Sequence, residues 1–437
     1  MIIDEEYFKD GLDEKLIARL IRRHQRESVK YRKLYNYYKG EHDIVSRKKA
    51  SQSTSNNKIV CNHAKYIIDM TKSYLIGNPI TYTASEGYDI EPIKNAYLVQ
   101  DIASLDNIIE KEMSVYGKSF EYIYIDENSE PKSVPLSPVN TFMVYSTTVD
   151  KKPILAVHYY YKRDVDGTDD GVECMVCDNT YIYIYKSDAN NFDTIKKVSS
   201  NPHFFDEIPM IEYRNNEEEQ GDFEQLIPLI DAYNMLTSDR VNDKEQFVDS
   251  FLFLQGVELD DEQAKKLREE KILMGYEGAS AKYLSKVMTE NDIQVLADSL
   301  RRDIHRFSMV PDLSDDQFGN NLSGVAIKYK LMGFEQQVRN KERYFAKALK
   351  KRFMLYTKYY TLKGKMDYVP IHRVDIVFTR NLPENELEVS QMIKNLQGIA
   401  TKETLLSQLS FVADPKEEAT LSDNENFDLK SCAALQI

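Results

Sequence analysis

The residues that decide the fold lie between Ser323 and Lys363, where the sequence reads SGVAIKYKLMGFEQQVRNKERYFAKALKKRFMLYTKYYTLK. This stretch has no proline, and its apolar residues recur three, four or seven positions apart: Ile327, Leu331, Phe334, Val338, Phe345, Leu349, Phe353, Tyr356 and Tyr360. Such spacing is typical of one face of an α-helix. The sequence therefore predicts a single helix over 323–363. At roughly 1.5 Å per residue it would span about 60 Å, longer than most globular helices.

The charge of this stretch differs from that of the rest of the chain. Eleven Lys or Arg residues stand against Glu335 and Glu342, which gives 11 − 2 = +9. The whole chain carries −14, so the remaining residues sum to −14 − 9 = −23. A basic helix face is most often solvated or paired with acidic neighbours, and the alternative is a patch that holds nucleic acid. The acidic surplus elsewhere favours pairing.

A polar, acidic loop precedes the predicted helix. Residues 311–322 read PDLSDDQFGNNL. The glycine gives the loop backbone freedom that other residues lack. A long helix that starts from such a loop indicates a mechanical or scaffold part rather than a catalytic pocket.

The composition is that of a globular protein with two or three domains. Of the 437 residues, 42% are hydrophobic and 29% are charged, which is enough apolar material for a sizeable core. The negative balance argues against tight wrapping of nucleic acid, although DNA could slide past an acidic surface. Four scattered cysteines fit a reducing compartment rather than a disulfide scaffold. The acidic N-terminus does not resemble a signal peptide, and no apolar run approaches a membrane span. We expect synthesis in the cytosol and no membrane association.

The order of predicted elements places a small insert between two helices. The antiparallel β region is predicted from period-two apolar spacing over 117–214, and the polar residues 46–58 are predicted to form a mobile loop. The class is α+β. The other predicted elements are helices at 13–39, 62–76, 91–116, 222–249, 260–270, 289–307, 384–397 and 401–410, strands at 251–257, 272–276 and 374–378, and a loosely ordered tail after 414.

Motifs for catalysis or metal binding are incomplete. Residues 319–324 have the glycine spacing of a phosphate-binding loop, but Val325 and Ala326 stand where lysine and Ser/Thr are needed. Cys174 and Cys177 form a lone CxxC pair in a strand pattern, which favours two buried cysteines that point to opposite faces. The acidic stretch 164–171 lacks the glycine position and the glutamate of a calcium loop, which favours a hairpin turn. We therefore expect no enzyme activity, cofactor or metal.

Several short blocks, in order, resemble one protein family. They are YYKGEHDI at 37–44, NKIVCNHAKYIID at 57–69, YLIGNPITY at 74–82, YGKSFEY at 116–122, LSPVNTFMVY at 136–145, LIDAYN at 229–234, SDRVNDKEQF at 238–247, FTRNLP at 378–383 and TLLSQLSFVADP at 404–415. Across about 30–415 the chain resembles the portal proteins of tailed double-stranded DNA bacteriophages, in the branch of long-tailed phages and prophages of Gram-positive bacteria.

The resemblance implies a ring of subunits, usually twelve, at one vertex of the capsid in the virion, assembled in the host cytoplasm. Double-stranded DNA would pass through the ring during packaging and ejection. Terminase, a head–tail adaptor, and the major capsid and scaffolding proteins are the implied partners. The implied parts are a wing at 1–221, a stem helix at 222–250, a clip at 251–287, a second stem helix at 288–310, a tunnel loop at 311–322, the long wing helix with a return strand at 323–383, and a crown at 384–437.

The resemblance implies two groups of candidate functional residues. We expect the tunnel loop to approach DNA through Asp312, Asp315, Asp316, Gln317, Asn320 and Asn321, with Gly319 letting it change shape. We expect the clip to dock partners through Lys265, Lys266, Arg268 and Lys271. Two alternatives remain open at this point: another structural head or scaffold protein of a phage, and an uncharacterised nucleic-acid enzyme.

Overall fold

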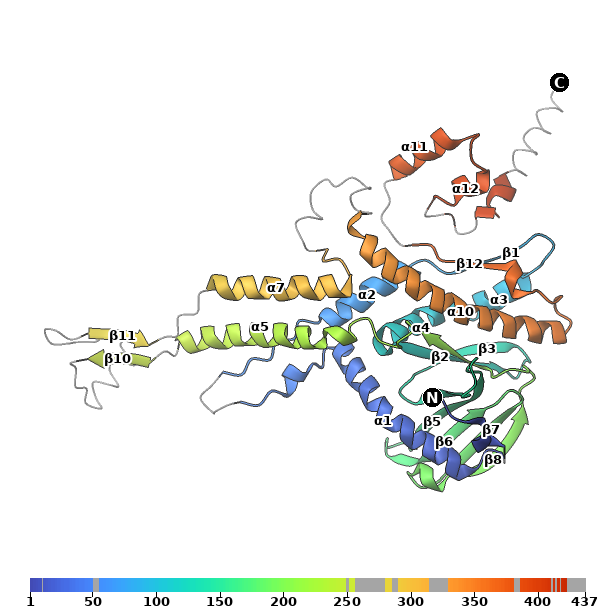
Figure 1. Cartoon of the computed structure of the whole chain (residues 1–437), viewed down its shortest axis with the longest axis horizontal. Helices are drawn as coiled ribbons and strands as arrows, with labels where there is room; N and C mark the ends of the chain where they lie inside the picture. Colours follow the sequence, from blue (N-terminus) through green and yellow to red (C-terminus); the bar gives the residue numbers. More distant parts are fainter. Residues whose placement is uncertain are drawn as a thin grey trace. The chain divides into compact units, whose positions relative to one another are not determined.

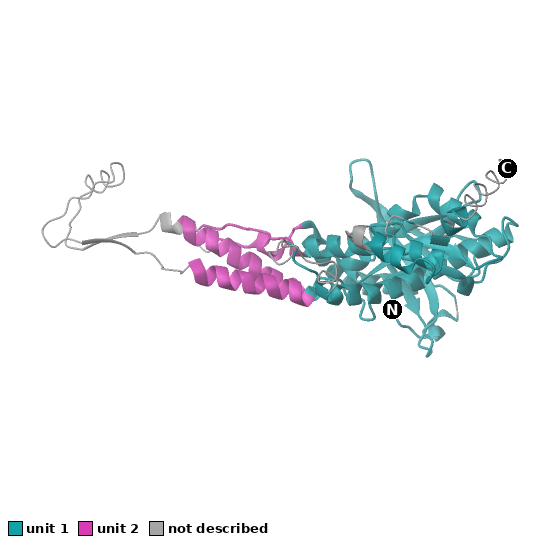
Figure 2. Cartoon of the chain, turned by 90° about the horizontal axis from the view of Figure 1, so that it is seen from above, with its two compact units in different colours: residues 1–39, 64–225, 308–437 teal, residues 40–63, 226–307 magenta. Residues whose placement is uncertain are grey.

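The computed structural model describes residues 1–9, 11–49, 55–248, 251–255, 280–284, 290–313, 329–380, 386–409, 412, 415–416 and 418–422. The chain forms two compact units, each built from separate stretches of sequence (Figure 2). Unit 1 comprises 1–39, 64–225 and 308–437, and unit 2 comprises 40–63 and 226–307. The fold mixes helices and sheets, as the sequence predicts.

The long helix of unit 1, α10 (Met332–Leu362), confirms the predicted apolar stripe but is shorter than predicted. Leu331 lies in a turn, and 323–328 are outside the described residues. Its 31 residues span about 46 Å at roughly 1.5 Å per residue. The stripe residues that the structure buries are Leu331, Phe334, Val338, Phe345, Leu349, Phe353, Tyr356 and Tyr360.

The N-terminal helices agree with the predictions except at one place. Helices α1 (Glu14–Lys39) and α2 (His63–Ile76) match the predicted bounds. The single helix predicted over 91–116 is wrong, because the chain forms α3 (Glu91–Val99) and α4 (Ile102–Tyr116). Asp101 interrupts the helix with a left-handed backbone, φ = 53°, and its side chain accepts a hydrogen bond from the Ser104 amide at 3.4 Å. It therefore caps α4 as an N-cap residue does.

The predicted β region is antiparallel but divides into two sheets. The first has the order β3-β2-β9, and the second runs β4-β5-β6-β7-β8 (Figure 1). The bounds are β2 Lys118–Ile125, β3 Pro131–Leu136, β4 Thr141–Tyr145, β5 Pro153–Arg163, β6 Asp169–Cys177, β7 Tyr181–Ser187, β8 Lys196–Pro202 and β9 Met210–Arg214. A third pair joins distant segments, since β1 (Thr81–Ala84) pairs with β12 (Val374–Val377).

The five-stranded sheet is covered on both faces. Ile17 and Ile21 of α1 pack on one face together with Cys174. Cys177 lies in a second cluster, with Phe120 of the three-stranded sheet. Side chains three positions apart on a strand point to opposite faces. The two cysteines are therefore free and buried on opposite sides, as predicted.

Unit 2 contains the two helices that flank the predicted insert. Helix α5 (Ile227–Val248) starts later than predicted, because a 3-10 turn (Glu224–Leu226) precedes it. Helix α7 (Glu290–Ser308) lies beside α5 (Figures 1 and 2). Strand β10 (Phe251–Gln255) lies within the predicted strand at 251–257. It pairs antiparallel with β11 (Ser280–Leu284), a strand that was not predicted. The predicted helix at 260–270 and strand at 272–276 lie outside the described residues.

Shorter elements complete the description. They are α11 (Glu386–Leu396), α12 (Lys402–Leu406) and the 3-10 turns Glu5–Phe8, Asp43–Ser46, Phe192–Thr194 and Ile371–Arg373. None of the helices in the described ranges is long and apolar enough to cross a membrane. Within those same ranges, no group of three or more His, Cys, Asp or Glu side chains is placed to hold a metal ion.

Candidate functional site

Most of the residues predicted to approach DNA lie outside the described residues. Of the loop set, the structure describes Asp312, whereas Asp315, Asp316, Gln317, Gly319, Asn320 and Asn321 are outside it. The clip set of Lys265, Lys266, Arg268 and Lys271 is also outside it. What the structure does establish is how the chain is fixed on either side of the loop.

A tyrosine of α2 holds the chain that enters the loop. The Tyr66 hydroxyl donates a hydrogen bond to the Pro311 carbonyl at 2.9 Å and accepts one from the Leu313 amide at 3.2 Å. Burial raises the pKa of the Tyr66 phenol, the bond from Leu313 lowers it, and the Asp312 carboxylate raises it, with a net rise. The phenol therefore keeps its proton at neutral pH and remains a donor to Pro311.

A second tyrosine of the same helix holds the chain that leaves the loop. The Tyr74 hydroxyl donates to a Glu335 carboxylate oxygen at 2.6 Å, in the first turn of α10. Arg339 and Arg380 also contact Glu335, at 2.7 and 3.3 Å. Burial alone would raise the pKa of Glu335, but these three partners bring it below its ordinary value. Glu335 is therefore ionised and well held.

The two tyrosines make α2 a common base for both ends of the loop. Tyr66 and Tyr74 are eight residues apart in one helix, which is about 12 Å along the axis and just over two turns. They therefore point about 80° apart around the axis of α2, so both lie on one half of its surface. Residues 314–328, which are outside the described residues and include 314–322 of the loop, connect these two anchored ends.

A buried lysine ties α10 to the segment that leads into α5. Lys341 Nζ lies 2.6 Å from Glu110 of α4 and 2.9 Å from Asp222, and it also donates to the Ser114 hydroxyl. Burial would lower the pKa of a lysine, but the two carboxylates raise that of Lys341 above its ordinary value. The Asp222 amide also donates to the Ser114 carbonyl, at 2.8 Å. One cation thus fixes three segments of unit 1.

A second buried cation lies three turns further along α10. Arg352 pairs with Asp106 at 2.7 Å and with Glu121 at 2.9 Å, and Tyr213 donates a hydrogen bond to Glu121. Burial raises the pKa of Asp106 to about 6, even though Arg352 opposes the rise. One arginine therefore faces two acids, and burial makes Asp106 easier to protonate than an ordinary aspartate.

These contacts confirm, within one chain, that the basic helix pairs with acidic neighbours. Lys358 pairs with Glu207, and Lys363 lies 3.7 Å from Glu130. The sequence did not single out Lys341 or Arg352. A signal was present, because each cation stands among the apolar stripe residues of α10 and charged side chains are rarely buried without partners.

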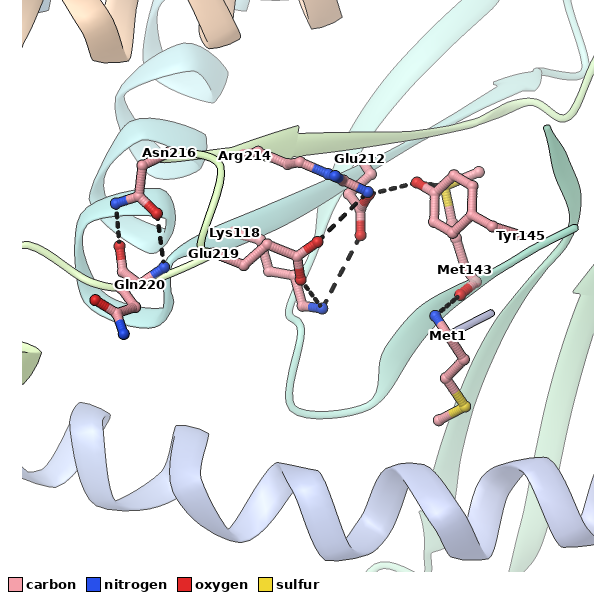
Figure 3. Close-up of polar contacts among 9 residues, drawn as sticks. All are labelled: Met1, Lys118, Met143, Tyr145, Glu212, Arg214, Asn216, Glu219 and Gln220. Carbon is pink, nitrogen blue, oxygen red and sulfur yellow. Dashed lines mark hydrogen bonds and ion pairs between the residues drawn. The ribbon is translucent and has the colours of Figure 1, made fainter. Parts of the chain in front are cut away.

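A polar cavity of about 730 Å³ lies beside this helix in unit 1. Figure 3 shows polar residues of its lining, among which Lys118 contacts Glu219 at 2.9 Å and Arg214 contacts Glu212 at 2.8 Å. The Met1 nitrogen donates to the Met143 carbonyl at 2.6 Å beside them. Apart from the Met1 amine, its charged lining balances five cations with five carboxylates: Lys118, Lys151, Arg214, Lys347 and Lys351, and Glu27, Asp150, Glu212, Glu217 and Glu219. This balance favours a self-neutralised structural cluster over a site for a small anion.

The loop that borders this cluster is closely packed. Asn216 and Gln220 close it through two hydrogen bonds of 2.9 Å (Figure 3). Gly117, with φ = 84°, is required here, because a Cβ would lie 2.0 Å from the Glu219 carbonyl oxygen. The chain that approaches α5 is thus held rigidly against the end of α4.

Comparison with known proteins agrees with the resemblance read from the sequence. The family model described as "Phage portal protein, SPP1 Gp6-like" matches residues 17–428. The chain belongs to this family of phage portal proteins. Among curated relatives of this portal protein, the portal protein of Bacillus phage SPP1 is 23% identical, with 94% of this chain and 86% of the relative covered. The portal protein of Clostridium phage phiCD119 is 22% identical, with 88% and 90% covered.

A solved structure is also similar to this portal protein. It is the neck of an empty GTA particle computed with C6 symmetry, with 12% identity and a TM-score of 0.45, covering 79% of this chain and 88% of the other. The family membership favours the portal hypothesis over another head or scaffold protein.

Proposed function

We propose that this portal protein assembles into a ring of twelve subunits at one vertex of a phage capsid and forms the conduit for DNA packaging and ejection. Portal proteins form oligomeric rings, and membership of that family supports the ring here. The observation that best supports a DNA conduit is that two tyrosines of α2 hold the chain on both sides of the loop. Tyr66 and Tyr74 fix the chain before and after an acidic loop.

We infer that the described elements would form the parts of such a ring. We assign α5 and α7 to the stem, β10 and β11 to the clip, and residues 311–322 to the tunnel loop. The sheets with α1–α4 and α10 would form the wing, and α11 with α12 the crown. In this assignment, Lys341 joins the wing helix to the segment that leads into the first stem helix.

The acidity of the proposed channel explains how DNA would pass without adhering. Asp312, Asp315 and Asp316 of the tunnel loop repeat once per subunit, so a closed ring presents belts of negative charge. Like charge opposes binding of phosphates at close range. Gln317, Asn320 and Asn321 add neutral polar contacts, and Gly319 permits the loop to change shape.

The proposed role is structural, and energy for DNA movement would come from a terminase. We propose that terminase and a head–tail adaptor dock at the clip through Lys265, Lys266, Arg268 and Lys271, and that major capsid and scaffolding proteins contact the outer ring in the virion. Changing these four residues to glutamate should weaken terminase or adaptor association while far-UV circular dichroism stays unchanged. Undiminished association would place docking elsewhere.

Deletion of residues 312–321 tests the loop. Purified variant protein should still form rings in negative-stain electron microscopy, and phage particles assembled with it should contain less DNA than wild-type particles. Intact packaging by the deletion variant would refute the role of the loop. Monomers or open filaments from the wild-type chain would instead favour another structural head protein.

A further inference from the structure

An extended segment of unit 2 lies antiparallel along α5 and is bonded to it at regular intervals. Three alternate residues donate their backbone amides to α5 side chains: Asn57 to Asn242 Oδ1 at 2.7 Å, Ile59 to Ser238 Oγ at 3.0 Å, and Cys61 to Asn234 Oδ1 at 2.8 Å. Residues 40–63 and α5 belong to the same unit (Figure 2).

The spacing of the two partners explains why the bonds repeat. Two residues of an extended chain advance by about 6.6 Å, and four residues of an α-helix advance by about 6.0 Å. Every second amide of the segment therefore meets every fourth side chain of the helix. Asn234, Ser238 and Asn242 are four residues apart and lie on one face of α5.

The α5 side chains are buried and have further partners. Asn234 and Ser238 are 0% exposed, and Asn242 is 5% exposed. Ser238 donates its hydroxyl to the Asn234 carbonyl at 2.7 Å, which leaves its lone pairs to accept from Ile59. The Asn234 amide nitrogen lies 2.8 Å from His42 Nδ1. Buried groups of this kind are costly when a partner is lost.

Additional contacts reinforce the same register. The Asn57 side-chain amide donates to Asn242 Oδ1 at 3.0 Å and to Glu245 at 2.9 Å. Arg47 pairs with Asp239, the residue that follows Ser238 in α5, at 2.6 Å. A shift of the segment by one residue would break these contacts together and leave buried acceptors unpaired.

We propose that residues 57–61 are a clasp that fixes the axial position of α5, and that Asn234, Ser238 and Asn242 are positioning residues for the DNA channel. The proposal rests on the proposed function, because α5 is assigned there to the stem. Apolar packing alone tolerates sliding, whereas a ladder of directed hydrogen bonds sets one register. In a ring, a common register of every stem helix would align the channel wall around the axis.

The test compares variants that keep or lose an acceptor. Ser238→Ala and Asn234→Leu each remove one acceptor. Asn234→Asp keeps the oxygen that accepts from the Cys61 amide and replaces the nitrogen opposite His42 by a second oxygen. Ser299→Ala is a matched truncation in α7. Hydrogen exchange measured by NMR or mass spectrometry on assembled rings should accelerate about fivefold or more at Ile59 in Ser238→Ala. That factor corresponds to a net hydrogen bond of about 1 kcal/mol. Ser299→Ala should leave this exchange unchanged.

Function is measured as the DNA content of particles assembled with each variant. Ser238→Ala and Asn234→Leu should form rings of normal mass but package less DNA, whereas Asn234→Asp and Ser299→Ala should package normally. Unchanged exchange at Ile59 would refute the clasp, and accelerated exchange with normal packaging would refute its positioning role. Absence of rings and packaging in wild-type and Ser299→Ala protein would contradict the proposed function instead.

Discussion

Replacing Tyr66 by phenylalanine removes one oxygen atom and keeps the ring that packs in α2. The lost hydroxyl donates to the Pro311 carbonyl at 2.9 Å and accepts from the Leu313 amide at 3.2 Å. A typical hydrogen bond contributes about 0.5–1.5 kcal/mol net. Because Tyr66 is half-buried and water can replace part of the loss, we expect the two bonds together to contribute about 1–2 kcal/mol. The detached state of the loop entrance should therefore become about 5–30-fold more populated.

Hydrogen exchange at the Leu313 amide measures this population directly. It should accelerate by that factor in Tyr66→Phe, while the midpoint of global unfolding changes little, because the bonds are local. Tyr181→Phe, which changes an exposed tyrosine of β7, is the matched control. Unchanged exchange at Leu313 in Tyr66→Phe would show that Tyr66 does not hold the loop entrance.

Three further predictions concern the body of unit 1. Lys341→Met leaves Glu110 and Asp222 without their cation and should lower the free energy of unfolding by about 3–5 kcal/mol in denaturant titration; a loss below about 1 kcal/mol, similar to that of Lys347→Met, would contradict the role of the pair. Because burial raises the pKa of Asp106 in the folded state to about 6, from an ordinary value of 3.8, the folded state holds an extra proton between these two pH values. The contribution of Asp106 to the free energy of unfolding should therefore fall as pH rises from about 4 to 6, by on the order of 3 kcal/mol at most. If the free energy of unfolding of the wild type and of Asp106→Asn changed with pH in the same way, this contribution of Asp106 would be excluded. Gly117→Ala should lower the free energy of unfolding by more than about 3 kcal/mol, because its Cβ would meet the Glu219 carbonyl. Gly364→Ala, with φ = 67° and open space around the Cβ, should lower it by about 1 kcal/mol. Equal losses of thermal stability in the two variants would contradict the packing argument.

The spacing of apolar residues in the sequence was enough to predict most of the long helices and the antiparallel strands. The stripe from Phe334 to Tyr360 identified α10, and period-two spacing identified the antiparallel strands. The break at Asp101 was missed, because both flanking segments have helical spacing and the left-handed residue is not glycine. The pairing of β1 with β12 was also missed, because it joins segments almost 300 residues apart and leaves no local signal.

The position of the candidate site in the chain was predicted from the family resemblance. The contacts that support the site were not predicted. The acidic loop was visible as composition, but nothing in the sequence indicated that Tyr66 and Tyr74 anchor its two ends. The polar residues 55–58 illustrate the same limit. Their composition predicted a mobile loop, whereas Asn57 is bonded to Asn242 of α5, because side-chain acceptors on a helix can satisfy an extended backbone. Lys341 and Arg352 acquire their roles from acids contributed by other segments.

The assembly state tests the central claim most directly. Native mass measurement of the purified full-length protein should give one particle, and twelve subunits of 50.8 kDa correspond to 12 × 50.8, or about 610 kDa. Negative-stain images of the same particle should show a closed ring with a central hole. A monomer near 50.8 kDa or a broad series of open filaments under conditions in which the protein remains folded would contradict a DNA conduit built from this chain.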